Sequence, residues 1–172
     1  MSKRGSPNLE RVQRDSNRAS DAKKESKPML RALQLAGQAA AMGEVPVGAV
    51  IVEKKSGRII AEAHNLVENH KDPTAHAEVL ALRQAAALMA TPRLVSCDLY
   101  VTLEPCPMCA QAISFARIRR LIFAAYDPKG GGVEHGARIF EQRSCHHRPE
   151  VIGGVMERTA AALLKDFFQA RR

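Results

Sequence analysis

The chain has 172 residues, of which 45% are apolar and 4% aromatic, so it can bury the core of one ordinary domain. Its formal net charge of +8 fits a polyanionic partner such as nucleic acid but does not by itself establish one. No apolar run approaches the roughly 18 residues of a membrane span and no signal-peptide core is present, which makes the cytoplasm the expected compartment. The four cysteines should be reduced there, so a close cysteine pair indicates metal or redox chemistry before a disulfide.

Residues 1–27 differ in composition from the rest of the chain. They carry eight Lys or Arg against four Asp or Glu, and only five apolar residues, too few to offset the entropy lost on ordering. We expect a disordered basic tail here, which is more readily explained as a solubilising segment than as an RNA-binding arm. One domain is expected over residues 28–172.

From residue 28 onward, the hydrophobic pattern predicts alternating helices and strands. In chain order the predicted elements are a helix over 29–42, strands over 47–53 and 57–63, a helix over 75–89, a strand over 97–103, a helix over 106–117, a strand over 119–125, a short helix over 136–143, a strand over 150–154 and a helix over 157–172. Strands joined by helices of ten or more residues pair in parallel and are covered on both faces. The expected fold is therefore a three-layer α/β/α sandwich whose central mixed five-stranded sheet has an early hairpin and later parallel strands. The Gly-rich segment 127–136 lacks the spacing of a phosphate loop, and a flexible loop is expected.

Two short motifs, "TAHAE" and "EPCPMC", are placed at helix starts by their prolines. Pro73 precedes His76, and Pro107 lies between Cys106 and Cys109; proline is tolerated at the start of a helix but not in its interior. Helix N-termini carry partial positive charge and free N–H groups, which favour thiolate over thiol. Two such tips at one end of the sheet would bring one imidazole and two thiolates together.

Three nitrogen and sulfur ligands suit Zn²⁺ and leave its fourth tetrahedral position open, which is typical of a catalytic site. Fourth-ligand candidates are Cys97, Cys145, His64, His70 and the His146-His147 pair, but none has a spacing that suggests it. Glu78 lies two residues after His76, about 200° around a helix, so both cannot bind one ion from the same face. Glu78 could instead transfer protons. H-x-E alone is a weak signal and CxxC a moderate one, but their combination at two helix starts favours a site over coincidence.

The pattern H-x-E…P-C-x-x-C resembles that of the zinc-dependent nucleoside and nucleobase deaminases. The segments "GEVPVGAVIV", "DPTAHAEVLALR", "LYVTLEPCPMCAQAI" and "LLKDFFQARR" are more closely similar to bacterial tRNA-specific adenosine deaminases, and the resemblance covers residues 28–172. It implies a cytidine deaminase-like fold and a homodimer that binds a tRNA anticodon stem-loop and hydrolyses the wobble adenosine to inosine. His76, Cys106 and Cys109 would then hold one Zn²⁺ per subunit, and Glu78 would shuttle protons between a zinc-bound hydroxide and the adenine.

The resemblance also implies substrate-binding roles for Asn65, Val47, Pro105 and Asp127. Pro105 has no N–H, so the Cys106 amide is the donor available at that point. Without the family resemblance, the residues alone allow structural roles: Asn65 could cap the second strand and Asp127 could start a turn. RNA contacts are expected from basic and aromatic side chains, namely Arg117, Arg119, Arg120, Arg148, Phe167 and Arg171.

The chain departs from the family pattern between Gly130 and His147, the segment expected to border the flanking nucleotides. Cys145 and the neighbouring histidines could form a second metal site there, although a variable loop is favoured. Two rival functions stay open. One is deamination of a free base, nucleoside or nucleotide of cytidine or guanine type; the other is a non-catalytic, zinc-stabilised RNA-binding subunit.

Overall fold

The computed structural model describes residues 26–171. Of the predicted tail, residues 1–25 lie outside the described residues, whereas Ser26 and Lys27 belong to a helix over residues 26–41. The domain boundary at residue 28 stays a prediction, because residues 1–25 lie outside the described part of the chain. None of the helices in residues 26–171 is long and apolar enough to span a membrane.

A five-stranded sheet with the order β2-β1-β3-β4-β5 forms the middle layer. Strand β1 (Gly48–Glu53) pairs antiparallel with β2 (Ile59–His64) and with β3 (Cys97–Leu103). Strands β3, β4 (Arg120–Ala125) and β5 (Glu150–Ile152) pair in parallel. The predicted mixed five-stranded sheet with an early hairpin is confirmed.

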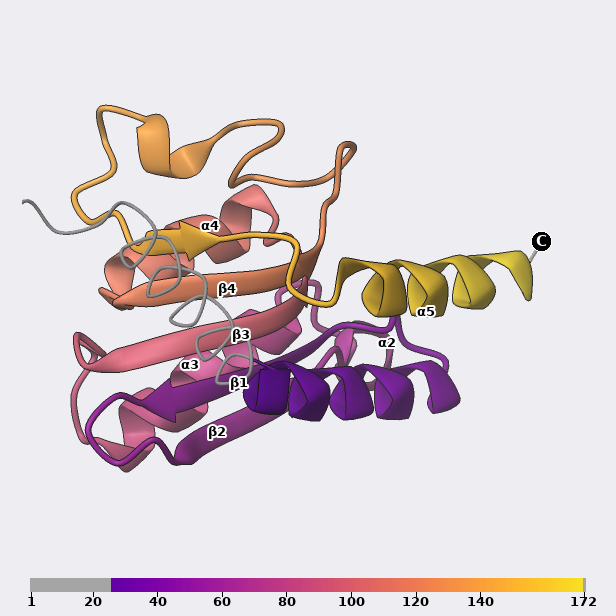
Figure 1. Ribbon diagram of the computed structural model, residues 1–172, viewed down its shortest axis with the longest axis horizontal. Coiled ribbons are helices and arrows are strands. Elements are labelled where there is room, and N and C mark those ends of the chain that lie inside the picture. The colour runs from indigo at the N-terminus through magenta and orange to yellow at the C-terminus, as the bar shows by residue number, and fades with distance from the viewer. Residues whose placement is uncertain (1–25, 172) are drawn as a thin grey trace, which may run out of the picture.

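Helices cover both faces of this sheet, as Figure 1 shows. The helix over residues 26–41 and α5 (Glu157–Gln169) lie on one face, where Met29, Val50 and Ile122 share one buried cluster. Helices α3 (Ala77–Leu88) and α4 (Pro107–Phe115) lie on the other face, over a larger cluster that includes Ile51, Leu99 and Phe123. The molecule is a three-layer α/β/α sandwich.

Three local differences from the sequence prediction have simple causes. Helix α2 (Val67–His70) was not predicted, because four residues are too few to show helical periodicity. The expected short helix over 136–143 is reduced to a single 3₁₀ turn, η1 (Ile139–Glu141). Helix α3 begins at Ala77 rather than Ala75, because His76 has extended backbone angles and caps the helix.

Strand direction determines where a site can form. Since β1 is antiparallel to both of its neighbours, β2, β3, β4 and β5 all run the same way. Their carboxyl ends therefore meet at one edge of the sheet, where α3 and α4 also begin. Crevices at this edge are the usual location of ligand sites in α/β sheets.

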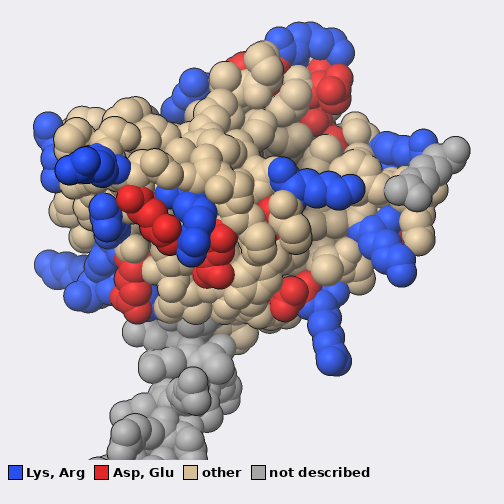
Figure 2. All heavy atoms as spheres, turned by 90° about the horizontal axis from the view of Figure 1, so that it is seen from above, with Lys and Arg blue, Asp and Glu red and all other residues tan. Residues whose placement is uncertain are grey.

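The charge of the chain is not gathered into one patch on the face displayed in Figure 2, where Lys and Arg are interspersed with Asp and Glu. The positive net charge of the chain therefore does not identify a nucleic-acid-binding surface on this face.

Candidate active site

The two motifs lie at the N-terminal tips of α3 and α4, as their prolines predict. His76 caps α3 and Cys106 caps α4, both with extended backbone angles. Pro107 is the first residue of α4, a position where its missing N–H has no intrahelical partner to lose. Cys109 follows within the first turn, so both thiols belong to the same helix tip.

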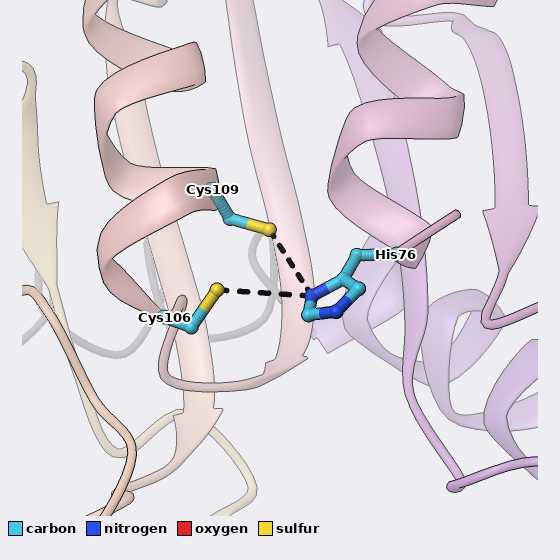
Figure 3. Close-up of side chains that lie close together, drawn as sticks. All are labelled: His76, Cys106 and Cys109. Carbon is cyan, nitrogen blue, oxygen red and sulfur yellow. Dashed lines mark hydrogen bonds between the residues drawn. The ribbon is translucent and has the colours of Figure 1, made fainter. Parts of the chain in front are cut away.

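The three donor atoms converge between these tips. The Nδ1 atom of His76 lies 3.7 Å from Sγ of Cys106 and 3.5 Å from Sγ of Cys109. Figure 3 shows the imidazole of His76 and both sulfur atoms pointing toward one another from the two helices. All three donors lie within 4.8 Å of one another.

These separations fit a zinc ion. Tetrahedral ligands bound at about 2.0 to 2.3 Å lie about 3.5 to 3.8 Å from one another. One imidazole nitrogen and two thiolates also match the ligand preference of Zn²⁺. Among the described residues, no other group of three His, Cys, Asp or Glu side chains meets the same geometric condition.

Hydrogen bonds within the cluster already favour a thiolate. The thiol of Cys109 and the ring of His76 stabilise the Cys106 thiolate and lower its pKa to about 4. The same contact with Cys106 raises the pKa of Cys109, and the interaction with Cys106 raises the pKa of His76. A cysteine that ionises readily is poised to bind a metal, because the thiolate is the ligand form.

Glu78 lies beside the cluster in the first turn of α3, and its side chain is buried, with the residue 4% exposed. Burial raises its pKa above the usual range, even though the neighbouring His76 favours the ionised form. A buried carboxyl group with a raised pKa that is not one of the three convergent donors is suited to exchanging protons.

A pocket of about 500 Å³ opens next to the cluster, a volume typical of small-molecule sites. His76, Glu78 and Cys106 line it together with residues from β-strand ends, loops and α5. Of the predicted substrate-binding residues, Val47, Asn65 and Asp127 line this pocket, and so do Phe167 and Arg171 of the predicted RNA contacts. Pro105 is buried instead and accepts a hydrogen bond from the N–H of Gly132 at 2.8 Å.

Phe167 and Arg171 bring the C-terminal helix to the pocket. The Arg171 guanidinium lies 3.6 Å from the centroid of the Phe167 ring, within range of a cation–π contact. Phe167 is 7% exposed, whereas the adjacent Phe168 is 49% exposed. One of the two adjacent phenylalanines is thus buried and the other faces outward.

The structure does not bring the predicted arginines Arg117, Arg119 and Arg120 to the site. Arg120 begins β4 and Arg119 directly precedes it, at the edge of the sheet opposite the pocket, and both pair with Asp98. Arg148 is exposed and precedes β5, which runs parallel to β4, so it lies near that same edge.

Cys145 and His147 form a structural contact rather than a metal centre. The Nε2 atom of His147 donates to the carbonyl of Ile118 at 2.7 Å, and Ser114 donates to the carbonyl of His147 at 2.8 Å. Cys145 is buried and donates to the same carbonyl at 3.1 Å. These bonds attach the segment before β5 to the end of α4.

Two buried acids in the pocket wall, Glu44 and Glu104, were missed by the sequence reasoning. Glu44 accepts from the Asn65 side chain, and Glu104 accepts from the loop that contains Asp127. A sequence signal existed in both cases, because each acid interrupts or ends an apolar run. Acids in such positions are rarely fully buried unless they are paired.

Two helix tips that present one His and two Cys beside a buried Glu, on a three-layer α/β/α sandwich, define a zinc-dependent hydrolytic deaminase. Residues 22–125 match the family described as "Cytidine and deoxycytidylate deaminase zinc-binding region". The chain belongs to this cytidine and deoxycytidylate deaminase family.

Individual relatives show which deaminases the chain is similar to in sequence and structure. The chain is similar to a tRNA-specific adenosine deaminase of Agrobacterium fabrum, with 51% identity over 82% of this chain and 91% of the relative. A solved structure from a study of A-to-I editing by tRNA:A34 deaminases at the wobble position of transfer RNA has a TM-score of 0.78 and 50% identity, covering 81% of this chain and 99% of that one. A guanine deaminase from Nitrosomonas europaea has a TM-score of 0.71 and 27% identity, covering 81% and 82%.

Proposed function

We propose that the chain catalyses hydrolytic deamination of the wobble-position adenosine in a tRNA anticodon loop, giving inosine and ammonia. The observation that carries the proposal is the convergence of His76, Cys106 and Cys109 beside buried Glu78 in one pocket. The choice of substrate is supported by the tRNA-specific adenosine deaminase of Agrobacterium fabrum and by the structure from the tRNA:A34 deaminase study, at 51% and 50% identity.

A zinc ion held by His76, Cys106 and Cys109 would supply Lewis-acid activation of a water molecule near neutral pH. Glu78 takes a proton from the attacking water, holds it on a carboxylate oxygen and delivers it to N1 of the adenine. Glu78 then takes the remaining proton of the added water and delivers it to the amino group, which leaves C6 as ammonia while the oxygen stays on C6. Burial raises the pKa of Glu78, which favours the uptake of a proton by this carboxylate.

The remaining pocket residues bind the flipped nucleotide. Val47, which is 8% exposed, supplies an apolar contact for the base, while Asn65 and Asp127 supply polar contacts. Phe167 and Arg171 extend the pocket with an aromatic ring and a guanidinium, the groups on which unstacked RNA bases commonly stack. The arginines at the opposite edge of the sheet have no part in this pocket.

The proposed partner is a tRNA anticodon stem-loop, and the proposed assembly is a homodimer. The apolar outer surface of α3 and α4 supports self-association, because Leu88 and Phe115 there are 67% and 72% exposed. A shallow hollow between these helices is lined by Val79, Leu82 and Ala112 among others. Four free cysteines are consistent with the proposed cytoplasmic compartment.

The decisive experiment incubates the protein with an anticodon stem-loop carrying a wobble adenosine and, separately, with free adenosine, cytidine and guanine. We expect inosine in the stem-loop RNA and little ammonia from the free compounds. Release of ammonia from guanine with an unchanged stem-loop would reject the proposal in favour of the second candidate. That candidate is a free-purine deaminase, which the structural likeness to the Nitrosomonas guanine deaminase supports.

A further inference from the structure

Glu104 is a fully buried carboxylate that has no place in the chemistry described above. It follows the last residue of β3 and precedes Pro105 and Cys106, so it lies on the connection that delivers the first thiol. Its side chain has no exposed surface. A carboxylate in such a place requires a full set of hydrogen-bond donors.

Within residues 26–171, the donors to Glu104 come from the loop over residues 127–136, which links β4 to the segment before β5. Oε1 of Glu104 accepts from the N–H groups of Val133 at 3.3 Å, Glu134 at 2.8 Å and His135 at 2.9 Å. Oε2 accepts from the N–H of Asp127 at 3.0 Å and contacts Nδ1 of His135 at 2.7 Å. The loop is thus wrapped around one carboxylate, and His135 Nδ1 must be the donor while Glu104 is ionised.

The glycines of this loop make the close approach possible. A Cβ atom on Gly131 would lie 2.6 Å from the carboxyl carbon of Glu104, and one on Gly132 would lie 2.5 Å from the nitrogen of Pro107. Both glycines are buried. The expectation of a flexible loop is therefore corrected: the consecutive glycines allow the backbone to pack against Glu104 and the tip of α4.

The same loop forms part of the pocket wall. Asp127 and Gly130 line the pocket together with Glu104, His76 and Cys106. Asp127 is bound at both ends, because its N–H donates to Glu104 while its carboxylate accepts from the N–H groups of Lys129 and Gly130 at 3.1 and 2.9 Å. Glu104 thus holds the backbone of Asp127, while the N–H groups of Lys129 and Gly130 hold its side chain.

We propose that Glu104, with His135 as its side-chain partner, is a positioning residue that fixes the 127–136 loop as the substrate-facing wall of the pocket. It acts on substrate binding through Asp127 and the loop backbone, and it does not bind the metal. The effect of Glu104 on KM rests on the proposed deaminase function. Its effect on the position of the 127–136 loop does not depend on which substrate the protein uses.

The test compares Glu104→Gln with a matched control, Glu134→Gln, whose exposed side chain belongs to the same loop and whose hydrogen bond to Glu104 comes from the backbone N–H, which the substitution keeps. A glutamine at 104 can still accept three N–H groups on its oxygen, but its NH₂ group then faces the N–H of Asp127, so this bond is lost. We expect KM for the stem-loop RNA to rise roughly tenfold in Glu104→Gln, with kcat within about threefold and one zinc per chain retained. Glu134→Gln should match the wild type.

A rescue pair tests the partner. His135→Asn places a side-chain N–H near the position of Nδ1 and should keep KM within about twofold of the wild type, whereas His135→Leu should raise KM about fivefold. Hydrogen-exchange mass spectrometry of substrate-free protein should show about tenfold faster exchange in residues 127–136 of Glu104→Gln. This measurement holds even if the wild type deaminates a free purine instead of RNA.

Several results would overturn the inference. Unchanged hydrogen exchange in Glu104→Gln would show that the carboxylate does not hold the loop. Faster exchange with unchanged KM would show that the loop does not position the substrate. Loss of zinc, or a fall in kcat with constant KM, would assign Glu104 to the metal site instead. Failure of the wild type to act on the RNA, with faster loop exchange in Glu104→Gln, would reject the proposed function alone.

Discussion

The side-chain amide of Asn65 donates to the carboxylate of Glu44 at 3.1 Å, and this contact determines which atom Asn65 can offer to a substrate. Both residues are buried, at 6% and 1% exposed, and both line the pocket. An ionised carboxylate only accepts hydrogen bonds, so the nitrogen of the Asn65 amide must face Glu44. The Asn65 oxygen is left as the acceptor for a donor on the bound nucleotide.

Glu44→Gln should weaken substrate binding, because the side-chain amide of Asn65 is then no longer held in a single orientation. A glutamine can present either its oxygen or its nitrogen, so the Asn65 amide gains a second, non-productive orientation. We expect KM for the stem-loop RNA to rise about fivefold to tenfold with little change in kcat, measured by inosine formation.

Asn69→Ala is the matched control for this variant. Asn69 also binds Glu44, through its backbone N–H at 2.8 Å and its side chain at 3.2 Å, but the backbone bond survives the substitution. KM should therefore stay within about twofold of the wild type. An equal rise in KM for both variants would show that general destabilisation, rather than the Asn65 orientation, weakens binding.

Stability should depend on pH through Glu44. Burial by itself raises the pKa of Glu44, but the hydrogen bonds from Asn69, Glu68 and Asn65 outweigh it, and the net pKa lies below the ordinary value of 4.5. The folded state therefore binds a proton less readily than the unfolded state does. The ionised Glu44 therefore stabilises the folded state fully above pH 4.5. This stabilisation is lost as the pH falls through the pKa that Glu44 has in the folded state.

The measurement is the free energy of unfolding in urea for the wild type and Glu44→Gln between pH 3.5 and 7. We expect the wild type to be more stable by about 1 to 3 kcal/mol at pH 7, and the difference to shrink below pH 4.5. A difference that stays constant over the whole range would show that the ionised carboxylate is not the stabilising species.

Much of the site could be predicted from sequence because its signals are local. Pro73 and Pro107 define two helix starts, and the ligands lie within one turn of them. Glu44 and Glu104 were missed because their partners are 21 to 31 residues away, and only the folded sheet brings them together. Arg119 and Arg120 were expected at the RNA because an RNA-binding enzyme needs basic side chains for phosphates. Arg120 instead begins β4 and Arg119 precedes it, so both lie at the edge of the sheet opposite the carboxyl end of β4.

Removal of one thiol should remove the metal. Cys106→Ala leaves two donors, His76 and Cys109, and we expect the zinc content, measured by plasma mass spectrometry, to fall from about one per chain to near zero. Deamination should fall below detection at the same time. Cys145→Ala removes a buried thiol outside the cluster and should retain zinc. Loss of zinc from both variants would contradict the assignment of the ligand set.

Glu78→Gln should separate metal binding from catalysis. The amide fills the same buried space but cannot accept and release the proton that the reaction requires. We expect kcat to fall by about 10²- to 10⁴-fold, with one zinc per chain and near-normal affinity for the stem-loop RNA. Glu62→Gln, at a partly exposed acid on β2 that pairs with Arg31, serves as the control and should leave kcat unchanged. Substantial activity in Glu78→Gln would remove Glu78 from the proton-transfer role.

The proposed homodimer should depend on the apolar outer surface of α3 and α4. Phe115 is 72% exposed at the end of α4, beside Leu82 and Ala112 in the shallow hollow. A carboxylate buried at a protein interface without a partner is strongly unfavourable, so Phe115→Glu should shift the protein from dimer to monomer. Light scattering coupled to size-exclusion chromatography measures the mass directly.

Phe168→Glu supplies the comparison, because Phe168 is also an exposed phenylalanine, at 49%, but lies on α5 on the opposite face of the sheet. It should remain dimeric, since that substitution leaves the α3 and α4 surface intact. If Phe115→Glu stays dimeric while Phe168→Glu dissociates, the interface lies on the α5 face of the sheet. If the wild type itself is monomeric at micromolar concentration, the exposed apolar surface of α3 and α4 does not mediate self-association.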